Sequence, residues 1–396
     1  MPLLSVARVL FAVISLVVLA LAGYLAWSWY DGDLVRTASG AVYFTREAWR
    51  LWAAIGLGAW SLLGRWVIPR LVSRKDRNPT LARRDGGRTF HAAGGDALYV
   101  EQHGPQDGVP ILLTHGWGLD STIWEYARRD LGRRFRLILW DLPGMGRSRL
   151  ARGHRLSLDG FARDLGSVIE LAKGRPVVLV GHSIGGMTIQ TLARQRPELF
   201  GREIAGVVLV NTTYTNPLKT MLLRRLAQAL RWPLIEPMMW ATIVLQPLAW
   251  LSAWQSYLSG WAHLANRLGF GRYATLSQLE HTTLLTTRNP PGVSARGNLA
   301  MFRWDAAAAL PKIGCPVLVL TGSMDIVTRP EASRHIASLI PHAELREVEH
   351  VNHMGFLERA DLYNRAIADF AETVQTATAE TVAPPQRTRA VRAAAG

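Results

Sequence analysis

The stretch VVLVGHSIGGM, residues 177–187, decides the fold of this chain. Its first four residues are apolar and mostly β-branched, which predicts a buried strand, and the residues after Gly186 return to helical spacing. Ser183 stands at the turn between them, with Gly181 and Gly185 two residues to either side. A serine at such a turn has a strained backbone, so its neighbours must be small. The stretch therefore predicts a strand, a sharp turn that lifts the serine hydroxyl clear of the sheet, and a helix whose first amides turn toward it.

Strand and helix patterns alternate on both sides of this turn. After an edge hairpin at 88–91 and 98–103, strands are expected at 109–114, 136–140, 177–180, 204–211, 316–320 and 344–348, and helices at 158–173 and 331–339. Such alternation is typical of a mostly parallel sheet with helices on both faces. The expected fold class is therefore α/β, with an eight-stranded sheet.

Three other motifs also stand at the ends of expected strands. In chain order they are His115-Gly116-Trp117-Gly118 after 109–114, Asp325 after 316–320, and His353 after 344–348. Together with Ser183 they give a nucleophile, an acid and a base in the order Ser, Asp, His, and a glycine-rich loop. A second histidine, His350, competes with His353 for the role of the base.

This set of motifs resembles the α/β-hydrolase family over residues 88–374. The resemblance implies a catalytic triad of Ser183, His353 and Asp325. It also implies an oxyanion hole formed by the backbone amides of Trp117 and Ile184, which would stabilise charge that exists only near the transition state.

The family pattern favours His353 over His350, because a glutamate five residues later, Glu358, follows an apolar Leu357. The family often has glycine just before this histidine, whereas here Asn352 stands there; asparagine tolerates the left-handed backbone that glycine would adopt. A second companion motif of the family, D-x-P-G-x-G-x-S, begins at Asp141 and implies no catalytic role.

Residues 212–301 interrupt the alternation and are helical and unusually apolar. In the family an insertion at this position forms a cap over the active site, and its tryptophans would help to line a pocket: Trp232, Trp240, Trp250, Trp254 and Trp261. Two alternatives remain open. The tryptophans are simply core residues, or residues 240–261 dip into a bilayer.

The N-terminal region predicts a membrane anchor. Residues 9–30 carry no charge and, at about 1.5 Å per residue, are long enough to cross a hydrocarbon core of roughly 30 Å. Aromatic residues Trp27, Trp29 and Tyr30 close the run like an interfacial belt. The alternative is a cleaved signal peptide, because Ala20-Leu21-Ala22 resembles a cleavage site, but the apolar run continues past it.

A second helix is expected at 49–69, although its uncharged part, 51–64, is short for a span, and a re-entrant or interfacial helix is the alternative. With two spans, Arg70, Arg74, Lys75 and Arg77 lie on the same side as Arg8, and Asp31 and Asp33 lie opposite. The positive-inside rule then predicts a membrane protein with a cytoplasmic catalytic domain. If the protein is bacterial, the expected membrane is the inner, cytoplasmic one. One span would place that domain outside.

The expected organisation is an anchor at 1–74, a linker at 75–87, a hydrolase core at 88–211 and 302–374, a cap at 212–301 and a disordered tail at 375–396 rich in alanine, threonine and proline. The formal charge of +15 is compatible with nucleic acid or anionic lipid. No nucleic-acid-binding motif is present, so the bilayer is the expected partner. The single cysteine, Cys315, excludes an intramolecular disulfide. No cofactor or metal motif is recognised.

The sequence thus predicts a membrane-anchored serine hydrolase that cleaves carboxylic esters of lipophilic acyl substrates, similar to the monoacylglycerol lipases of the family. Serine at position 183 argues against epoxide hydrolases and haloalkane dehalogenases, which use aspartate there. Alternatives with the same triad are a thioesterase, an amidase or peptidase, a carbon–carbon bond hydrolase and a perhydrolase. A ligand receptor without catalysis is a further alternative. The sequence leaves the oligomeric state open.

Overall fold

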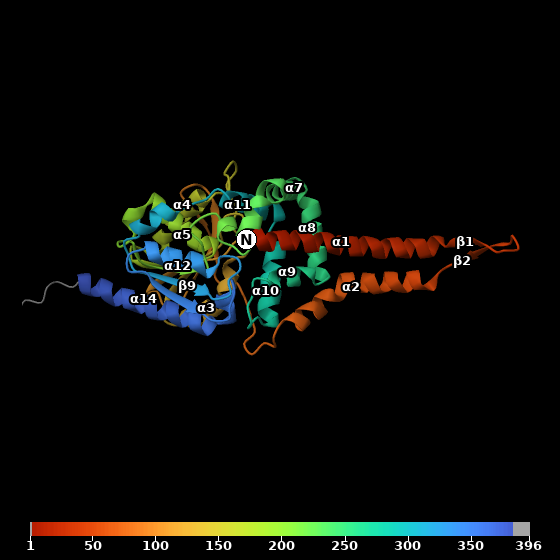
Figure 1. Ribbon diagram of the computed structural model, residues 1–396. Helices are drawn as coiled ribbons and strands as arrows, with labels where there is room; N and C mark the ends of the chain where they lie inside the picture. Colours follow the sequence, from red (N-terminus) through yellow and green to blue (C-terminus); the bar gives the residue numbers. More distant parts are fainter. Residues whose placement is uncertain (1, 383–396) are drawn as a thin grey trace, which may run out of the picture.

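An eight-stranded sheet lies at the centre of the computed structural model, which describes residues 2–382 (Figure 1). The strand order is β10-β9-β8-β7-β5-β6-β4-β3. The strands are β3 (Arg88–His91), β4 (Ala97–His103), β5 (Pro110–Thr114), β6 (Arg136–Trp140), β7 (Val177–His182), β8 (Ile204–Val210), β9 (Val317–Gly322) and β10 (Glu344–Val348). Only the pairs β3–β4 and β4–β6 are antiparallel. The predicted fold class is confirmed.

Helices cover both faces of this sheet. One face packs against α4 (Leu158–Ile169), α5 (Ile184–Gln195) and α12 (Pro330–Leu339), and the other against α3 (Glu125–Leu131) and α14 (Ala360–Val382). Because the central strands are buried on both sides, β5, β6, β7 and β9 are fully buried along their length. Short helical turns connect the layers: η1 (Ser121–Trp124), η2 (Glu170–Ala172), η3 (Pro197–Leu199), η4 (Pro217–Lys219), η6 (Ala307–Lys312) and α13 (Gly355–Glu358).

Between β8 and β9 the chain forms an all-helical cap, at the position where the sequence predicts one. It comprises α6 (Arg224–Ala229), η5 (Arg231–Ile235), α7 (Glu236–Val244), α8 (Gln246–Leu258), α9 (Trp261–Arg267), α10 (Leu276–Arg288) and α11 (Pro291–Met301). Pro237 and Pro247 lie in the first turns of α7 and α8, where a missing amide hydrogen costs nothing. The chain therefore turns sharply between these two helices.

Two N-terminal helices form a hairpin that projects from the cap (Figure 1). They are α1 (Pro2–Asp31) and α2 (Ala48–Val72), joined by the short strands β1 (Asp33–Arg36) and β2 (Val42–Thr45). Both helices are longer than the sequence suggests. Residues 4–31 and 48–72 are long and apolar enough to cross a membrane, and α7 with α8 would make a third such segment if the bent pair, at 101°, counts as one.

The hairpin packs closely on the cap. Ser15 Oγ of α1 lies 2.8 Å from Ser259 Oγ at the end of α8, and both serines are buried. A Cβ on Gly64 of α2 would stand 2.2 Å from the Ser259 carbonyl oxygen, so only glycine permits this approach. The sequence offers no sign that the anchor docks on residues nearly 250 positions later.

Two of the predicted segments, the linker and the C-terminal tail, differ from what the sequence suggests. The segment expected to be a linker, 75–87, has no helix or strand but is fixed to the domain, because Arg84 forms ion pairs with Asp120 and Asp141. The tail was expected to be disordered from 375, yet α14 continues to Val382. Alanine and glutamate favour helix, and the first proline comes only at Pro384, so nothing in the sequence ends the helix earlier. Residues 383–396 lie outside the described residues.

The docking of α1 on α8 can be tested by disulfide trapping. In a Cys315→Ala background, the pair Ser15→Cys and Ser259→Cys should form a disulfide under mild oxidation, because the two side chains already touch. Non-reducing electrophoresis and peptide mass spectrometry would detect it. The control pair is Val17→Cys with Ser259→Cys, since Val17 is 60% exposed. Equal cross-linking of both pairs, or of neither, would contradict the docked arrangement.

Candidate active site

Ser183 stands at a strained turn between β7 and α5. Its φ of 57° and ψ of −114° lie in a region that non-glycine residues avoid. The surrounding glycines are required by packing, since a Cβ on Gly181 would stand 2.5 Å from the Gly185 carbonyl carbon. One on Gly185 would stand 2.4 Å from the Thr114 oxygen. The turn is the strand-turn-helix arrangement that the sequence predicts.

The structure brings Ser183, His353 and Asp325 together. Ser183 Oγ lies 2.9 Å from His353 Nε2, and His353 Nδ1 lies 3.0 Å from Asp325 Oδ2. All three residues are buried. They follow β7, β10 and β9 respectively, and because these strands are parallel their carboxyl ends meet at one edge of the sheet. Such a series can move a proton from the serine to the imidazole while the carboxylate orients the ring.

Asp325 is held as a carboxylate by several donors. Its Oδ1 accepts from the Val327 and Thr328 amides, and its Oδ2 accepts from Asn211 Nδ2 and the Thr328 hydroxyl. Burial alone would raise the pKa of Asp325, but the charge and hydrogen bond of His353, together with the bonds from Asn211 and Thr328, outweigh it and hold the pKa below its ordinary value. Sequence reasoning missed Asn211 and Thr328, because no motif distinguishes a donor to a buried acid.

Asn352 connects three parts of the site, a role the sequence did not suggest. Its Oδ1 accepts from the amides of Ile326 and His353, and its Nδ2 donates to the Leu268 carbonyl oxygen of the cap. Asn352 does not use the left-handed backbone that asparagine tolerates. The left-handed residue of the loop is His350, with a φ of 63°, while Asn352 has no positive φ. The side-chain bonds of Asn352 fix the loop instead.

His350 and His353 have different surroundings. His350 is exposed, and its amide donates to Ser323 Oγ. His353 is buried against Ser183. Glu358, the glutamate of the family pattern, anchors this loop by accepting from the amides of Gly271, Tyr273 and Asn352.

The expected oxyanion donors lie beside Ser183. Ile184 is the first residue of α5, where the amide has no acceptor within its own helix. Trp117 lines the same small pocket as Ser183 and His353, and its indole Nε1 donates to the Ser294 carbonyl oxygen of the cap at 2.9 Å. The indole thus ties the loop after β5 to α11, and its position is set by core and cap together.

The imidazole ring of His182 packs against the rings of both His353 and Phe356. Its ring packs 4.9 Å from His353 and 4.5 Å from Phe356, and Nε2 donates to the His353 carbonyl oxygen at 3.1 Å. Burial, followed by the nearness of His353, lowers the pKa of His182 well below its ordinary value. His182 is therefore neutral and adds no positive charge beside an imidazolium at His353.

Two residues of α1 line the pocket beside Ser183, and no sequence pattern predicts either of them there. Leu4 and Arg8 share this pocket with Ser183 and His353, and Leu4 is buried. The N-terminal end of the anchor helix therefore forms part of the wall around the serine. A pattern of apolar residues predicts that a helix exists, but not which surface it contacts.

An α/β sheet with a serine at a sharp turn, a histidine and an acid at one sheet edge defines the class of α/β hydrolases. Residues 109–360 match the model of the alpha/beta hydrolase fold family, and the chain belongs to this family. Both N-terminal helices lie outside the matched region.

Several similar proteins are named as esterases or other hydrolases. The chain is 28% identical over 276 residues to a pimeloyl-acyl-carrier-protein methyl ester esterase of Chromobacterium violaceum, covering 70% of this chain and 98% of the relative. It is also 28% identical over 283 residues to a putative carbamate hydrolase of Azorhizobium caulinodans, covering 71% of this chain and 97% of that one.

Solved structures agree with these relatives. An esterase of Thermogutta terrifontis is 25% identical with a TM-score of 0.53, over 73% of this chain and 99% of that one. An esterase of Rhodococcus sp. ECU1013, 21% identical with a TM-score of 0.60 over 73% of this chain and 100% of that one, shares the fold. The protein is an enzyme of the hydrolase class, of the carboxylic ester hydrolase type.

The two histidines can be separated by mutation. His353→Ala should lower kcat by roughly 10⁴-fold or more, because Ser183 loses its proton acceptor. His350→Ala should retain most activity, since that side chain is exposed. Steady-state kinetics on a p-nitrophenyl ester, with thermal melting to verify folding, would measure both. A greater loss of activity in His350→Ala than in His353→Ala would show that His350, and not His353, is the base.

Proposed function

We propose that this protein is a membrane-anchored serine esterase that cleaves carboxylic esters of lipophilic substrates through an acyl-enzyme. The observation that carries the proposal is the hydrogen-bonded series Ser183–His353–Asp325 beside a cap to which the apolar hairpin is docked. Membrane anchoring and the roles of these residues are part of the proposal.

In the proposed mechanism, His353 takes the proton of Ser183 as its oxygen attacks the ester carbonyl carbon. The amides of Trp117 and Ile184 hold the negative oxygen, and Asp325 stabilises the imidazolium. His353 then gives the proton to the leaving alcohol as the ester C–O bond breaks. A water that His353 deprotonates attacks the acyl-enzyme, and Ser183 recovers its proton as the acid leaves.

The distribution of exposed apolar side chains supports membrane contact. In the described parts of the core, 88–211 and 302–374, Met324 is the sole exposed large hydrophobic residue. The hairpin and the cap expose many more. Those of the cap lie mainly between α6 and α8: Leu222, Leu223, Leu226, Trp232, Leu234, Trp240, Val244, Leu245, Leu248 and Leu251. Exposed apolar surface of this extent is typical of a protein or membrane contact site.

The hairpin favours an arrangement in which its tip crosses to the far side of the bilayer. Both the start of α1 and the end of α2 lie beside the catalytic domain, and the turn β1–β2 lies at the distal end (Figure 1). At that end Arg46 lies over the rings of Trp29 and Tyr30, and Arg50 pairs with Asp33. The basic residues after α2, which lie at the end beside the catalytic domain together with Arg8, support a cytoplasmic catalytic domain.

Relatives that are named as esterases favour the hydrolysis of carboxylic esters over the alternative reactions. A thioesterase, amidase, carbon–carbon bond hydrolase or perhydrolase would use the same residues. A receptor without catalysis would not require the hydrogen bond between Ser183 and His353.

Hydrolysis of p-nitrophenyl esters tests the proposed chemistry. Detergent-solubilised protein should cleave a series from two to sixteen carbons with kcat/KM rising with chain length, because longer acyl chains bury more apolar surface. Ser183→Ala should lower kcat roughly 10⁴- to 10⁶-fold. Activity on short esters alone would refute the lipophilic substrate. The absence of turnover on every ester would refute the esterase.

Membrane topology can be tested with single cysteines in a Cys315→Ala background. Ser39→Cys, in the turn between β1 and β2, should react with an impermeant maleimide added outside intact cells. Glu372→Cys, on the exposed side of α14, should react only after the cells are opened. Equal labelling of both in intact cells would contradict a cytoplasmic catalytic domain, and extraction of the protein by carbonate would contradict an anchor.

A further inference from the structure

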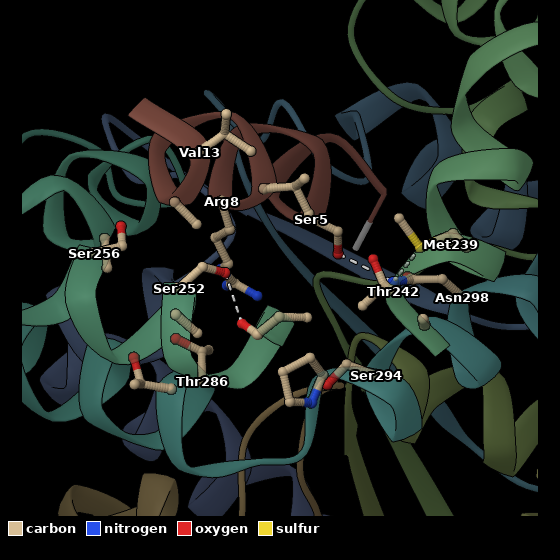
Figure 2. Close-up of a pocket in the computed structure, with 18 of the residues that line it drawn as sticks. Ser5, Arg8, Val13, Met239, Thr242, Ser252, Ser256, Thr286, Ser294 and Asn298 are labelled. Carbon is tan, nitrogen blue, oxygen red and sulfur yellow. Dashed lines mark hydrogen bonds between the residues drawn. The ribbon is translucent and has the colours of Figure 1, made fainter. Parts of the chain in front are cut away.

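A cavity of about 140 Å³ lies between α1 and the cap (Figure 2). Its walls come from α1, α7, α8, α9, α10 and α11. The lining mixes small apolar residues with hydroxyl groups, including Ser5, Ser252, Ser256, Ser294, Thr242 and Thr286. Ligand pockets usually measure roughly 300–1,000 Å³, so this cavity suits a polar headgroup better than a long acyl chain.

Arg8 points from α1 into this cavity (Figure 2). Its Nη2 donates to Asn266 Oδ1 at 2.8 Å, and the amide of Asn266 is oriented by its own Nδ2 donating to the Ala262 carbonyl oxygen. The Nε of Arg8 is buried and has no hydrogen-bond partner among residues 2–382. A neutral amide is therefore the main partner of a guanidinium that is always charged.

No acidic residue compensates this charge. Arg8 forms no ion pair within the described chain, and neither the cavity nor the catalytic pocket is lined by aspartate or glutamate. Moving a cation out of water is costly unless an anion accompanies it. Two further buried polar atoms of the cavity lining, Ser256 Oγ and Asn298 Oδ1, also lack partners in the same part of the chain.

The same arginine also reaches the catalytic pocket. Arg8 and Asn266 line both the cavity and the pocket that contains Ser183 and His353. Arg8 Nη1 lies 3.8 Å from the point where a Cβ on Gly118 would stand, on the loop that carries Trp117. A group bound to Arg8 in the cavity would therefore belong to the molecule whose ester bond lies at Ser183.

We propose that Arg8 is a specificity-determining residue that binds an anionic oxygen group, a carboxylate or a phosphate, of an amphiphilic ester substrate. The proposal rests on the proposed esterase function and narrows its substrate class. A guanidinium binds both groups through two parallel N–H donors, and the hydroxyls around it supply further donors. The lipophilic part of the substrate extends toward the exposed apolar side of α1, where Val13 lines the cavity.

The test compares esters that differ only in the charged group. One pair is a p-nitrophenyl ester with a terminal carboxylate on its acyl chain and the uncharged ester of equal length. The other is lysophosphatidic acid and the monoacylglycerol with the same acyl chain. The wild-type enzyme should prefer the charged member of at least one pair in kcat/KM. The preferred pair distinguishes a carboxylate on the acyl side from a phosphate on the alcohol side.

Arg8→Met should lower this preference by about 10- to 100-fold, the value of a charge-assisted hydrogen bond pair. Asn266→Asp keeps Arg8 but places a carboxylate against it, and should lower the preference to a similar extent. The control is Arg46→Met, because Arg46 lies at the distal end of the hairpin. Thermal melting verifies that each variant folds.

The outcomes separate this inference from the function on which it rests. If Ser183→Ala abolishes turnover but the wild type prefers neither charged ester, or Arg8→Met and Asn266→Asp leave the preference unchanged, the role of Arg8 is refuted and the esterase stands. If Ser183→Ala retains full turnover, the proposed function itself fails. A loss of preference in Arg46→Met as large as in Arg8→Met would also refute a specific role for Arg8.

Discussion

The left-handed backbone of Ser183 is the constraint on which the rest of the site depends. A φ of 57° at a serine is unfavourable. The backbone keeps this conformation because β7 and α5 pack closely through the glycines on either side of Ser183. The neighbouring parallel strands β7, β8, β9 and β10 then determine where the remaining groups lie, since their carboxyl ends share one edge. Asp325 and His353 reach the serine from separate loops, and Asn352 connects those loops to each other and to the cap.

The hairpin of α1 and α2 is an integral part of the folded protein, because it packs on the cap. A helix that only held the domain at a membrane would end before the domain begins. Here α1 extends past the cap surface until Leu4 and Arg8 line the pocket of the serine. The close packing at Gly64 and the contact between Ser15 and Ser259 hold the hairpin in this position. The same surface of the cap that receives the hairpin encloses the cavity, so the hairpin contact and the cavity share one set of helices.

The sequence predicts the parts of this structure that depend on local patterns. The eight strands, the turn at Ser183 and the cap follow from apolar runs, glycines and a change of period, and the family motifs name the triad candidates. Contacts between distant segments carry no such pattern. Asn211, Thr328 and Asn352 are recognisable as donors only when the loops after β8, β9 and β10 meet. The left-handed residue of this loop is His350, while the side chain of Asn352 accepts hydrogen bonds from the Ile326 and His353 amides. Likewise, hydropathy predicts the helix α1, but it does not predict the hydrogen bond from Arg8 of α1 to Asn266 of α9.

The docking of α1 on the cap also sets an order of assembly. Ser15 and Ser259 are separated by 244 positions, so α1 must wait for the synthesis of all the residues between them before its partner surface exists. Closing such a long loop is slow and is entropically unfavourable until many contacts form together. During that interval the hydrolase core has no complete pocket. The pocket beside Ser183 is therefore complete only after α1 and the cap have met, which makes the assembly of this pocket depend on the docking of the hairpin.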